Sequence, residues 1–134
     1  MTRKASTVKT GDNFEIKANI GRYMPIYYAG AGGDFNPIHI DAEFGKMVGL
    51  GGAILQGLCT MAITARTHVD WAGDPAALKR IKVRFSKPVY PEDEIAVRSK
   101  VVAVEGKVVK TEYVAVNQNG VEVITRAFTD LNLE

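Results

Sequence analysis

A carboxylate and an imidazole lie on one short segment of the sequence, residues 32–39. Asp34 and His39 are close enough along the chain to converge. Pro37 stiffens the segment, because it fixes its own φ and biases Asn36 toward an extended conformation. A carboxylate beside a histidine is a recurrent general acid/base pair, since both groups exchange protons near neutral pH when their surroundings tune them. On spacing alone an alternative stays open, in which Asp34 caps the following turn and His39 is a hydrogen-bonded residue of the core.

Other kinds of site find less support in the sequence. The chain has two histidines and one cysteine, and His68 has no matching ligand pattern, so we expect no metal site. The glycines of residues 30–33 lack the spacing and the Lys-Ser/Thr ending of a P-loop, and we expect no cofactor. Cys59 stands alone, which excludes an intramolecular disulfide and fits a reducing compartment.

Basic and apolar residues alternate over residues 78–87. The basic residues are Lys79, Arg80, Lys82, Arg84 and Lys87, and the apolar residues among them include Ile81, Val83 and Phe85. This alternation is typical of a strand with one solvated face, and the alternative is a surface, including Arg84, that holds a phosphate of the substrate. The formal charge is +2, from 17 basic and 15 acidic residues without a long block of one sign. Nucleic acid is therefore not the expected partner.

Four segments of the second half carry strand signals. They are residues 78–89, 95–104, 108–117 and 121–131, which are rich in Val, Ile, Tyr, Phe and Thr. Short breaks at residues 105–107 and at Asn119-Gly120 separate the last three segments. Asn-Gly predicts a tight hairpin, because both residues tolerate positive φ. The last three strands are therefore predicted to form an antiparallel meander.

The first half is predicted to hold one short strand and several helices. The strand covers residues 14–18, and helices cover 22–30, 41–47 and 53–69, with a glycine-rich break after the first helix. The longest helix has two apolar stripes, one of Ile54, Leu58, Met61, Ala65 and Val69, the other of Leu55, Cys59, Ala62 and Ile63. Thr60, Thr64 and Arg66 then fall on a narrow polar side. We expect this helix to be buried.

These elements predict one domain over residues 1–134, because the chain is long enough for one core and too short to suggest two. A buried helix followed by a meander favours an α+β fold in which an antiparallel sheet wraps the helix. Open sheet edges favour a dimer. Residues 1–13 lack the apolar stretch of a signal peptide, and no apolar run is long enough to span a bilayer, so we expect a cytoplasmic protein.

Three segments carry a resemblance to a known family. Residues 28–41, with the core Gly33-Asp34-Phe35-Asn36-Pro37-Ile38-His39, resemble the hydratase motif of the MaoC-like group, which includes (R)-specific enoyl-CoA hydratases and 3-hydroxyacyl-thioester dehydratases. The resemblance extends to residues 51–58, where the family starts its central helix, and to residues 83–89, which are similar to the following strand. Most of the chain is covered.

The resemblance implies a hot-dog fold, in which a long central helix is wrapped by an antiparallel β-sheet. It also implies that Asp34 and His39 hold and activate the water that adds across the α,β double bond, and return a proton to the α-carbon. The backbone N–H of Gly57 is expected to bind the thioester carbonyl. We expect Asn36, Gln56 and Arg84 to contribute to substrate binding.

Three positions depart from the family pattern. Gln56 stands where many members carry His, Ala65 where some carry Ser, and Gly32 where Ser is commoner. We expect these changes to affect substrate preference more than reaction type, because none removes Asp34 or His39.

The expected activity is that of a lyase, a hydratase/dehydratase that interconverts trans-2-enoyl and (R)-3-hydroxyacyl thioesters of coenzyme A or acyl carrier protein in fatty-acid metabolism. Two alternatives stay open: a hot-dog acyl thioesterase, and a non-catalytic partner subunit of a heterodimeric dehydratase. The expected assembly is a homodimer, or a heterodimer with a related hot-dog subunit.

Overall fold

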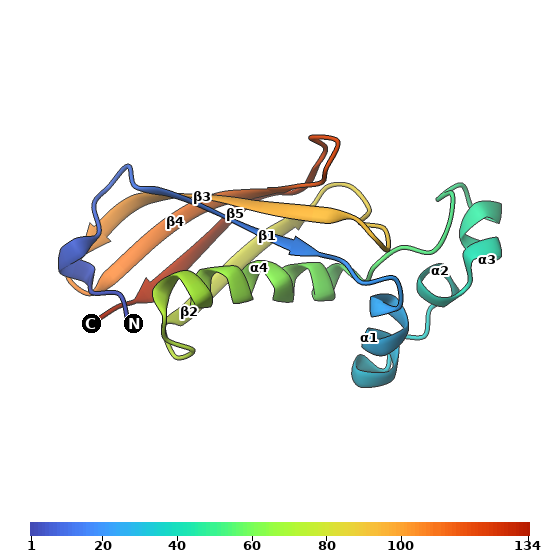
Figure 1. Cartoon of the computed structure of the whole chain (residues 1–134), viewed down its shortest axis with the longest axis horizontal. Coiled ribbons are helices and arrows are strands. Elements are labelled where there is room, and N and C mark those ends of the chain that lie inside the picture. Colours follow the sequence, from blue (N-terminus) through green and yellow to red (C-terminus); the bar gives the residue numbers. More distant parts are fainter.

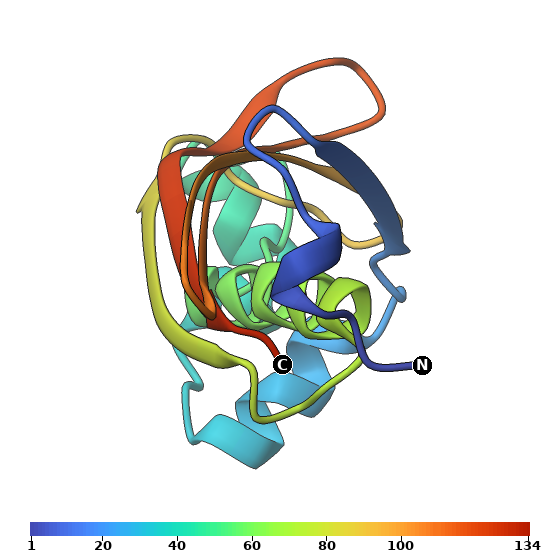
Figure 2. The same cartoon turned by 90° about the vertical axis from the view of Figure 1, so that its left-hand side faces the viewer.

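An antiparallel sheet of five strands curves around one long helix in the computed structural model, which describes residues 1–134 (Figures 1 and 2). The strands are β1 (Asn13–Asn19), β2 (Leu78–Phe85), β3 (Glu94–Glu105), β4 (Val108–Val116) and β5 (Glu122–Asn132), in the spatial order β1-β3-β4-β5-β2. The helices are a 3₁₀ turn at Ala5–Thr7, α1 (Met24–Gly32), α2 (Pro37–Ile40), α3 (Ala42–Met47) and α4 (Gly57–Ala72). The predicted α+β architecture, a hot-dog fold, is confirmed.

The last three strands form the predicted meander, but the two turns differ from expectation. Glu105 pairs with Val108, so the first turn has two residues and contains Gly106 at φ 61°. The Asn119-Gly120 hairpin forms through a longer loop, residues 117–121, because the Asn117 side chain accepts hydrogen bonds from two backbone N–H groups inside it. Of the Asn-Gly pair only Gly120 has a positive φ.

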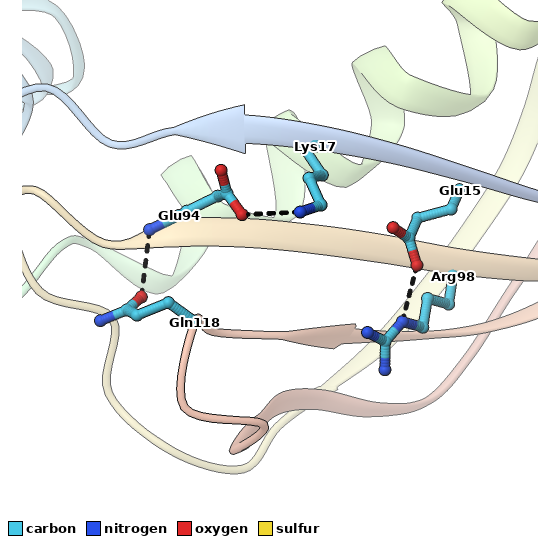
Figure 3. Close-up of polar contacts among 5 residues, drawn as sticks. All are labelled: Glu15, Lys17, Glu94, Arg98 and Gln118. Carbon is cyan, nitrogen blue, oxygen red and sulfur yellow. Dashed lines mark hydrogen bonds and ion pairs between the residues drawn. The ribbon is translucent and has the colours of Figure 1, made fainter.

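Strand β1 lies at one edge of the sheet and is tied to β3 by side chains as well as by its backbone (Figure 3). Lys17 Nζ lies 3.0 Å from Glu94 Oε1, and Arg98 Nε donates to Glu15 Oε2 at 2.7 Å. These ion pairs are exposed to solvent, so each adds little to stability. They accompany the backbone pairing with β3, which is the only neighbour of this edge strand.

Helix α4 begins at Gly57, four residues later than predicted. Residues 53–56 are not helical, because the N–H of Ile54 donates to Ile38 O and the N–H of Leu55 donates to Val89 O. The helix then runs to Ala72 and ends at Gly73, which adopts the left-handed conformation at φ 70°.

Helix α4 buries only one residue of the two predicted apolar stripes, Cys59. Its buried residues are Cys59, Thr60, Thr64, Thr67, His68 and Ala72, whereas Leu58 is 63% exposed. The threonines tolerate burial because their hydroxyls find partners: Thr64 Oγ1 donates to Met61 O, and Thr67 Oγ1 donates to Thr64 O. The prediction of a narrow polar side at Thr60 and Thr64 was therefore wrong.

The two ends of the chain lie together at one end of the molecule, and α1, α2 and α3 lie at the other (Figure 1). The N–H of Ala5 donates to Glu134 O at 2.8 Å, and the N–H of Arg3 donates to Ala72 O at 2.8 Å. The C-terminal end of α4 thus lies against the chain ends, and its N-terminal end points toward the three short helices (Figure 1).

Candidate active site

Asp34 lies in the connection between two short helices. Helix α1 continues through Gly32, two residues beyond its predicted end, and stops at Gly33, whose φ of 74° is left-handed. A helix that sequence reading did not predict, α2, follows within three residues of Asp34, because Asn36 caps it by accepting a hydrogen bond from Ile38 N–H at 3.2 Å. Asp34 Oδ1 accepts a weak hydrogen bond from Asn36 N–H at 3.3 Å. One carboxylate oxygen of Asp34 therefore stabilises the turn, as the capping alternative predicts.

The other carboxylate oxygen of Asp34 faces His39. The distance from His39 Nε2 to Asp34 Oδ2 is 3.5 Å. His39 Nδ1 lies 2.8 Å from the carbonyl oxygen of Ile54, and a carbonyl can only accept, so Nδ1 carries the hydrogen. In the neutral imidazole, Nε2 then presents its lone pair on the side of Asp34. The structure therefore brings the two predicted residues together.

The Asp34–His39 pair is open to solvent on one side only. The His39 side chain is 9% exposed and that of Asp34 is 47% exposed. At 3.5 Å the two groups are slightly too far apart for a good direct hydrogen bond. A water molecule beside them can donate one hydrogen to each acceptor, which leaves an oxygen lone pair directed away from both. This arrangement suits the activation of water.

Gly57 places an open backbone donor at the start of α4. Gln56 O accepts from the N–H groups of Cys59 and Thr60, whereas the N–H of Gly57 has no partner within the chain. An unpaired N–H in the first turn of a 16-residue helix also lies at the positive end of the helix dipole. A carbonyl oxygen that gains negative charge would be stabilised there.

The structure links this donor to His39 through a short stretch of backbone. Ile54, whose carbonyl holds the His39 ring, lies three residues before Gly57. A Cβ on Gly57 would lie 3.3 Å from the ring of Phe85, which comes from strand β2. The sequence did not predict these contacts of Ile54 and Phe85, because the first is made by a backbone carbonyl and the second joins distant segments.

The three predicted binding residues lie in different environments. Asn36 caps α2 beside the pair, as described above. The Gln56 side chain is 1% exposed and its Nε2 donates to Pro25 O at 3.0 Å, so it points into the protein and not toward His39. Arg84 is exposed on β2, where it pairs with Thr125 and precedes Phe85.

Exposed apolar side chains gather on the elements at this end of the molecule. They are Phe35 (59% exposed), Ile40 (40%), Met47 (74%), Val48 (49%), Leu58 (63%) and Phe85 (51%). Large contiguous apolar patches on a protein surface often mark an interaction site. A groove of about 900 Å³ lies elsewhere, on strands β1, β3, β4 and β5, and none of the predicted site residues lines it.

The other reactive side chains are buried away from the pair. His68 lies between α4 and the sheet, where Nδ1 donates to Thr64 O at 2.7 Å and Nε2 lies 3.0 Å from Ser99 Oγ. Burial lowers the pKa of His68, and burial raises the pKa of the Cys59 thiol. No group of three or more His, Cys, Asp or Glu side chains is placed to hold a metal ion. None of the helices combines the length and apolar character needed to cross a membrane.

The sequence matches the family model described as MaoC like domain over residues 3–124. Among curated proteins, it is 47% identical over 72 residues to a probable enoyl-CoA hydratase 2 of Dictyostelium discoideum, covering 52% of this chain and 24% of that protein. It is 40% identical over 102 residues to peroxisomal multifunctional enzyme type 2 of Mus musculus, covering 74% of this chain and 13% of that protein. The chain thus spans a quarter or less of these relatives.

Solved structures share the fold over nearly the whole chain. The unliganded R-hydratase PhaJ1 from Pseudomonas aeruginosa superposes with a TM-score of 0.88 at 21% identity, over 97% of this chain and 84% of that one. The ChsH1-ChsH2 complex from Mycobacterium tuberculosis gives a TM-score of 0.84 at 26% identity, over 96% of this chain and 99% of the matched chain.

Proposed function

Because this chain belongs to the MaoC-like dehydratase family, we propose that it is a hydro-lyase that interconverts trans-2-enoyl and (R)-3-hydroxyacyl thioesters in fatty-acid metabolism. The observation that carries the proposal is the geometry of the Asp34–His39 pair. His39 Nε2 faces Asp34 Oδ2 at 3.5 Å, while Nδ1 is committed to Ile54 O. Asp34 Oδ2 and His39 Nε2 can both accept a hydrogen bond from one water molecule, and a base that holds and deprotonates water is what hydration requires.

In the hydration direction, Asp34 and His39 hold one water against the β-carbon of the enoyl thioester. Nε2 of His39 takes a proton from this water as its oxygen bonds to the β-carbon. The electron pair of the double bond moves through the α-carbon toward the thioester carbonyl. The imidazolium then returns a proton to the α-carbon, so the net addition is one water. Dehydration reverses these steps.

Gly57 is the proposed donor to the thioester carbonyl. The carbonyl oxygen gains negative charge when the β-carbon is attacked, and the unpaired N–H at the start of α4 can bind it. A preorganised donor of this kind lowers a barrier by roughly 3–4 kcal/mol. This interaction strengthens in the transition state, so it raises kcat more than it improves substrate binding.

Substrate binding is proposed to involve Asn36 and Arg84. Asn36 shapes the turn that carries Asp34. Arg84 is exposed on β2 and makes no ion pair within the chain, so its guanidinium is free to meet a phosphate of the thioester carrier, either coenzyme A or an acyl carrier protein. Arg84→Ala should then raise KM and weaken its dependence on salt.

The exposed apolar side chains around the pair are proposed to be covered by a second hot-dog subunit, identical or related. The ChsH1-ChsH2 structure is named as a complex of two proteins, which supports such an assembly. We propose a cytoplasmic location, with which a single free cysteine, Cys59, is compatible. The mouse relative is named as peroxisomal, so cell fractionation is the measurement that decides between the two compartments.

The test is the loss of enoyl absorbance when purified protein is mixed with crotonyl-CoA and with longer trans-2-enoyl-CoA substrates. Asp34→Asn and His39→Ala should each lower kcat at least about a hundredfold, the effect of a lost general acid or base. Glu43→Gln is the matched control, because Glu43 is an exposed carboxylate on the neighbouring α3 and pairs only with Lys46.

Circular dichroism must show that each variant is folded. Near-normal turnover in a folded Asp34→Asn or His39→Ala variant would remove that residue from the mechanism. Release of free thiol from the same substrates, without loss of the double bond by hydration, would instead establish a thioesterase. Absence of both reactions would support a non-catalytic subunit.

A further inference from the structure

The residues immediately before Gly57 are tied to the segment that carries the Asp34–His39 pair. Ile54 holds the His39 ring through its carbonyl oxygen at 2.8 Å, and its N–H donates to Ile38 O at 2.9 Å. The position of the Gly57 N–H relative to His39 is therefore set by a few bonds of backbone. These bonds do not include Asp34, which lies in the connection between α1 and α2. The position of Asp34 relative to the Gly57 N–H therefore depends on a different contact.

Gln56 supplies a contact of this kind. Its side chain is 1% exposed, and its Nε2 donates to the carbonyl oxygen of Pro25, a residue 31 positions earlier, at 3.0 Å. Pro25 lies in the first turn of α1, and α1 ends at Gly32, two residues before Asp34. This hydrogen bond thus joins the residue that precedes the Gly57 donor to the helix that leads into Asp34.

The same side chain is a poor contributor to stability. Gln56 Oε1 is the one buried side-chain polar atom in the structure that has no hydrogen-bond partner. An unsatisfied buried acceptor destabilises the folded state, and an apolar side chain of similar size would not carry it. A half-satisfied buried amide therefore requires an explanation other than stability.

We propose that Gln56 is a positioning residue that fixes the Gly57 N–H relative to Asp34 by holding α1 through Pro25 O. It acts through the backbone of Gly57 and does not touch the substrate. This inference rests on the proposed hydratase function. It replaces the expectation, drawn from the sequence, that Gln56 binds substrate.

The first test is Gln56→Met, which keeps an unbranched side chain of similar length and removes the donor. We expect kcat to fall at least about tenfold, because small displacements of reacting groups reduce rates strongly. KM should change less than twofold, and the midpoint of thermal unfolding should hold or rise, because the unsatisfied oxygen is removed as well. Thr111→Val is the control: Thr111 is also fully buried and hydrogen-bonded, to Thr129, but lies within the sheet. It should lower stability and leave kcat unchanged.

The second test is Gln56→Glu. It makes the hydrogen bond to Pro25 O depend on pH, which a loss of packing would not do. A protonated carboxyl can donate to Pro25 O, and an ionised one cannot. The kcat of Gln56→Glu, divided by that of the wild type at the same pH, should therefore rise as the pH falls, at a temperature where both proteins are folded. Should Gln56→Met fail to fold, this ratio decides the question.

A third measurement does not depend on activity. In amide NMR spectra, the Gly57 and Gly33 signals should both shift in Gln56→Met and stay in place in Thr111→Val. If the wild type hydrates enoyl-CoA but the Gln56 variants keep both kcat and the Gly33 signal unchanged, the inference about Gln56 is wrong and the proposed function stands. Wild-type protein that hydrates no enoyl-CoA overturns the proposed function, and the two amide signals then report on the coupling by themselves.

Discussion

At the scale of single residues, we propose that position 57 is a glycine because this leaves its backbone N–H accessible. Its φ is not in the left-handed range, so glycine is not required there by conformation. Its N–H has no partner, and a Cβ would lie 3.3 Å from the Phe85 ring. The space above this donor is therefore narrow, and a methyl group would occupy part of it.

Gly57→Ala should lower kcat by one to three orders of magnitude, roughly the effect of losing one oxyanion donor. Stability should change little. Alanine favours a helix by about 1 kcal/mol over glycine, and the Phe85 ring, which is half exposed, can move by the few tenths of an ångström that the new methyl group requires. The measurements are initial rates of enoyl-CoA hydration and urea unfolding.

Phe85→Leu separates the two effects of that methyl group. If activity returns when Phe85→Leu is combined with Gly57→Ala, the loss came from a displaced ring and not from a blocked donor. Full activity in the single Gly57→Ala variant would place the carbonyl donor at another N–H of the first turn.

At the scale of the elements, residue alternation predicted the strands well and helical spacing predicted α4 poorly. The predicted strands at residues 95–104 and 108–117 agree with β3 and β4 to within one residue at each end. Strand β2 stops at Phe85, and not at residue 89, because the chain leaves the sheet before Pro88. The buried face of α4 was missed because threonine counts as polar in a sequence, whereas Thr64 and Thr67 satisfy their hydroxyls on the carbonyls of their own helix.

His68, which is buried between α4 and the sheet, should make the stability of the protein depend on pH. Burial lowers the pKa of His68 in the folded protein, with the Thr64 carbonyl opposing this in part. The unfolded chain, with a pKa near 6.5, therefore takes up a proton before the folded protein does. The free energy of unfolding should thus fall as the pH drops below about 6.5. Urea midpoints between pH 7.5 and pH 5 measure this loss.

His68→Leu should remove that part of the pH dependence, although it also leaves Ser99 without its partner and lowers stability at every pH. Both proteins keep His39, so the difference between their pH profiles reports His68 alone. Parallel profiles would show that the pKa of His68 is the same in the folded and unfolded states.

Strand β5 contains a strained residue. Three residue steps of β5, from Thr125 to Phe128, lie opposite two steps of β2, from Arg84 to Lys82, which is a β-bulge. Arg126 lies in this bulge and has a φ of 47°. A left-handed conformation costs a residue with a Cβ about 1–2 kcal/mol. Glycine avoids that cost at the expense of some entropy.

Arg126→Gly should therefore raise the free energy of unfolding by about 0.5–1 kcal/mol in urea. Lys100→Gly, at an exposed position in the regular part of β3, is the control and should lower it by a similar amount. A destabilised Arg126→Gly protein would show that the arginine side chain makes a contribution that outweighs the strain.

At the scale of the whole molecule, the sequence predicted which residues converge but not what holds them. The motif at residues 33–39 predicted the Asp34–His39 pair, because both residues lie on one short segment. The restraint from Ile54 and the contact with Phe85 depend on how distant segments meet, which no local pattern encodes.

The apolar end of the molecule predicts an assembly of two subunits. Light scattering should give the wild type a mass of twice 14.6 kDa. Leu58 is 63% exposed at the start of α4, so Leu58→Lys should shift the mass to that of one chain, because a buried charge would disfavour the interface. Val102→Lys, at a partly exposed position on β3, should stay dimeric. An unchanged mass for Leu58→Lys would place the interface on another surface.

The two chain ends lie close together, so the protein is a candidate for circular permutation. Ala5 and Glu134 are hydrogen-bonded to each other, on the side of the molecule opposite α1–α3 (Figure 1). A short flexible linker could join the ends, and new ends could be opened in the exposed loop at residues 117–121. Such a circularly permuted protein would keep every strand pairing and the Asp34–His39 pair. By the same geometry, the domain can be inserted into a longer polypeptide with both connections leaving on one side, at the opposite end from α1–α3.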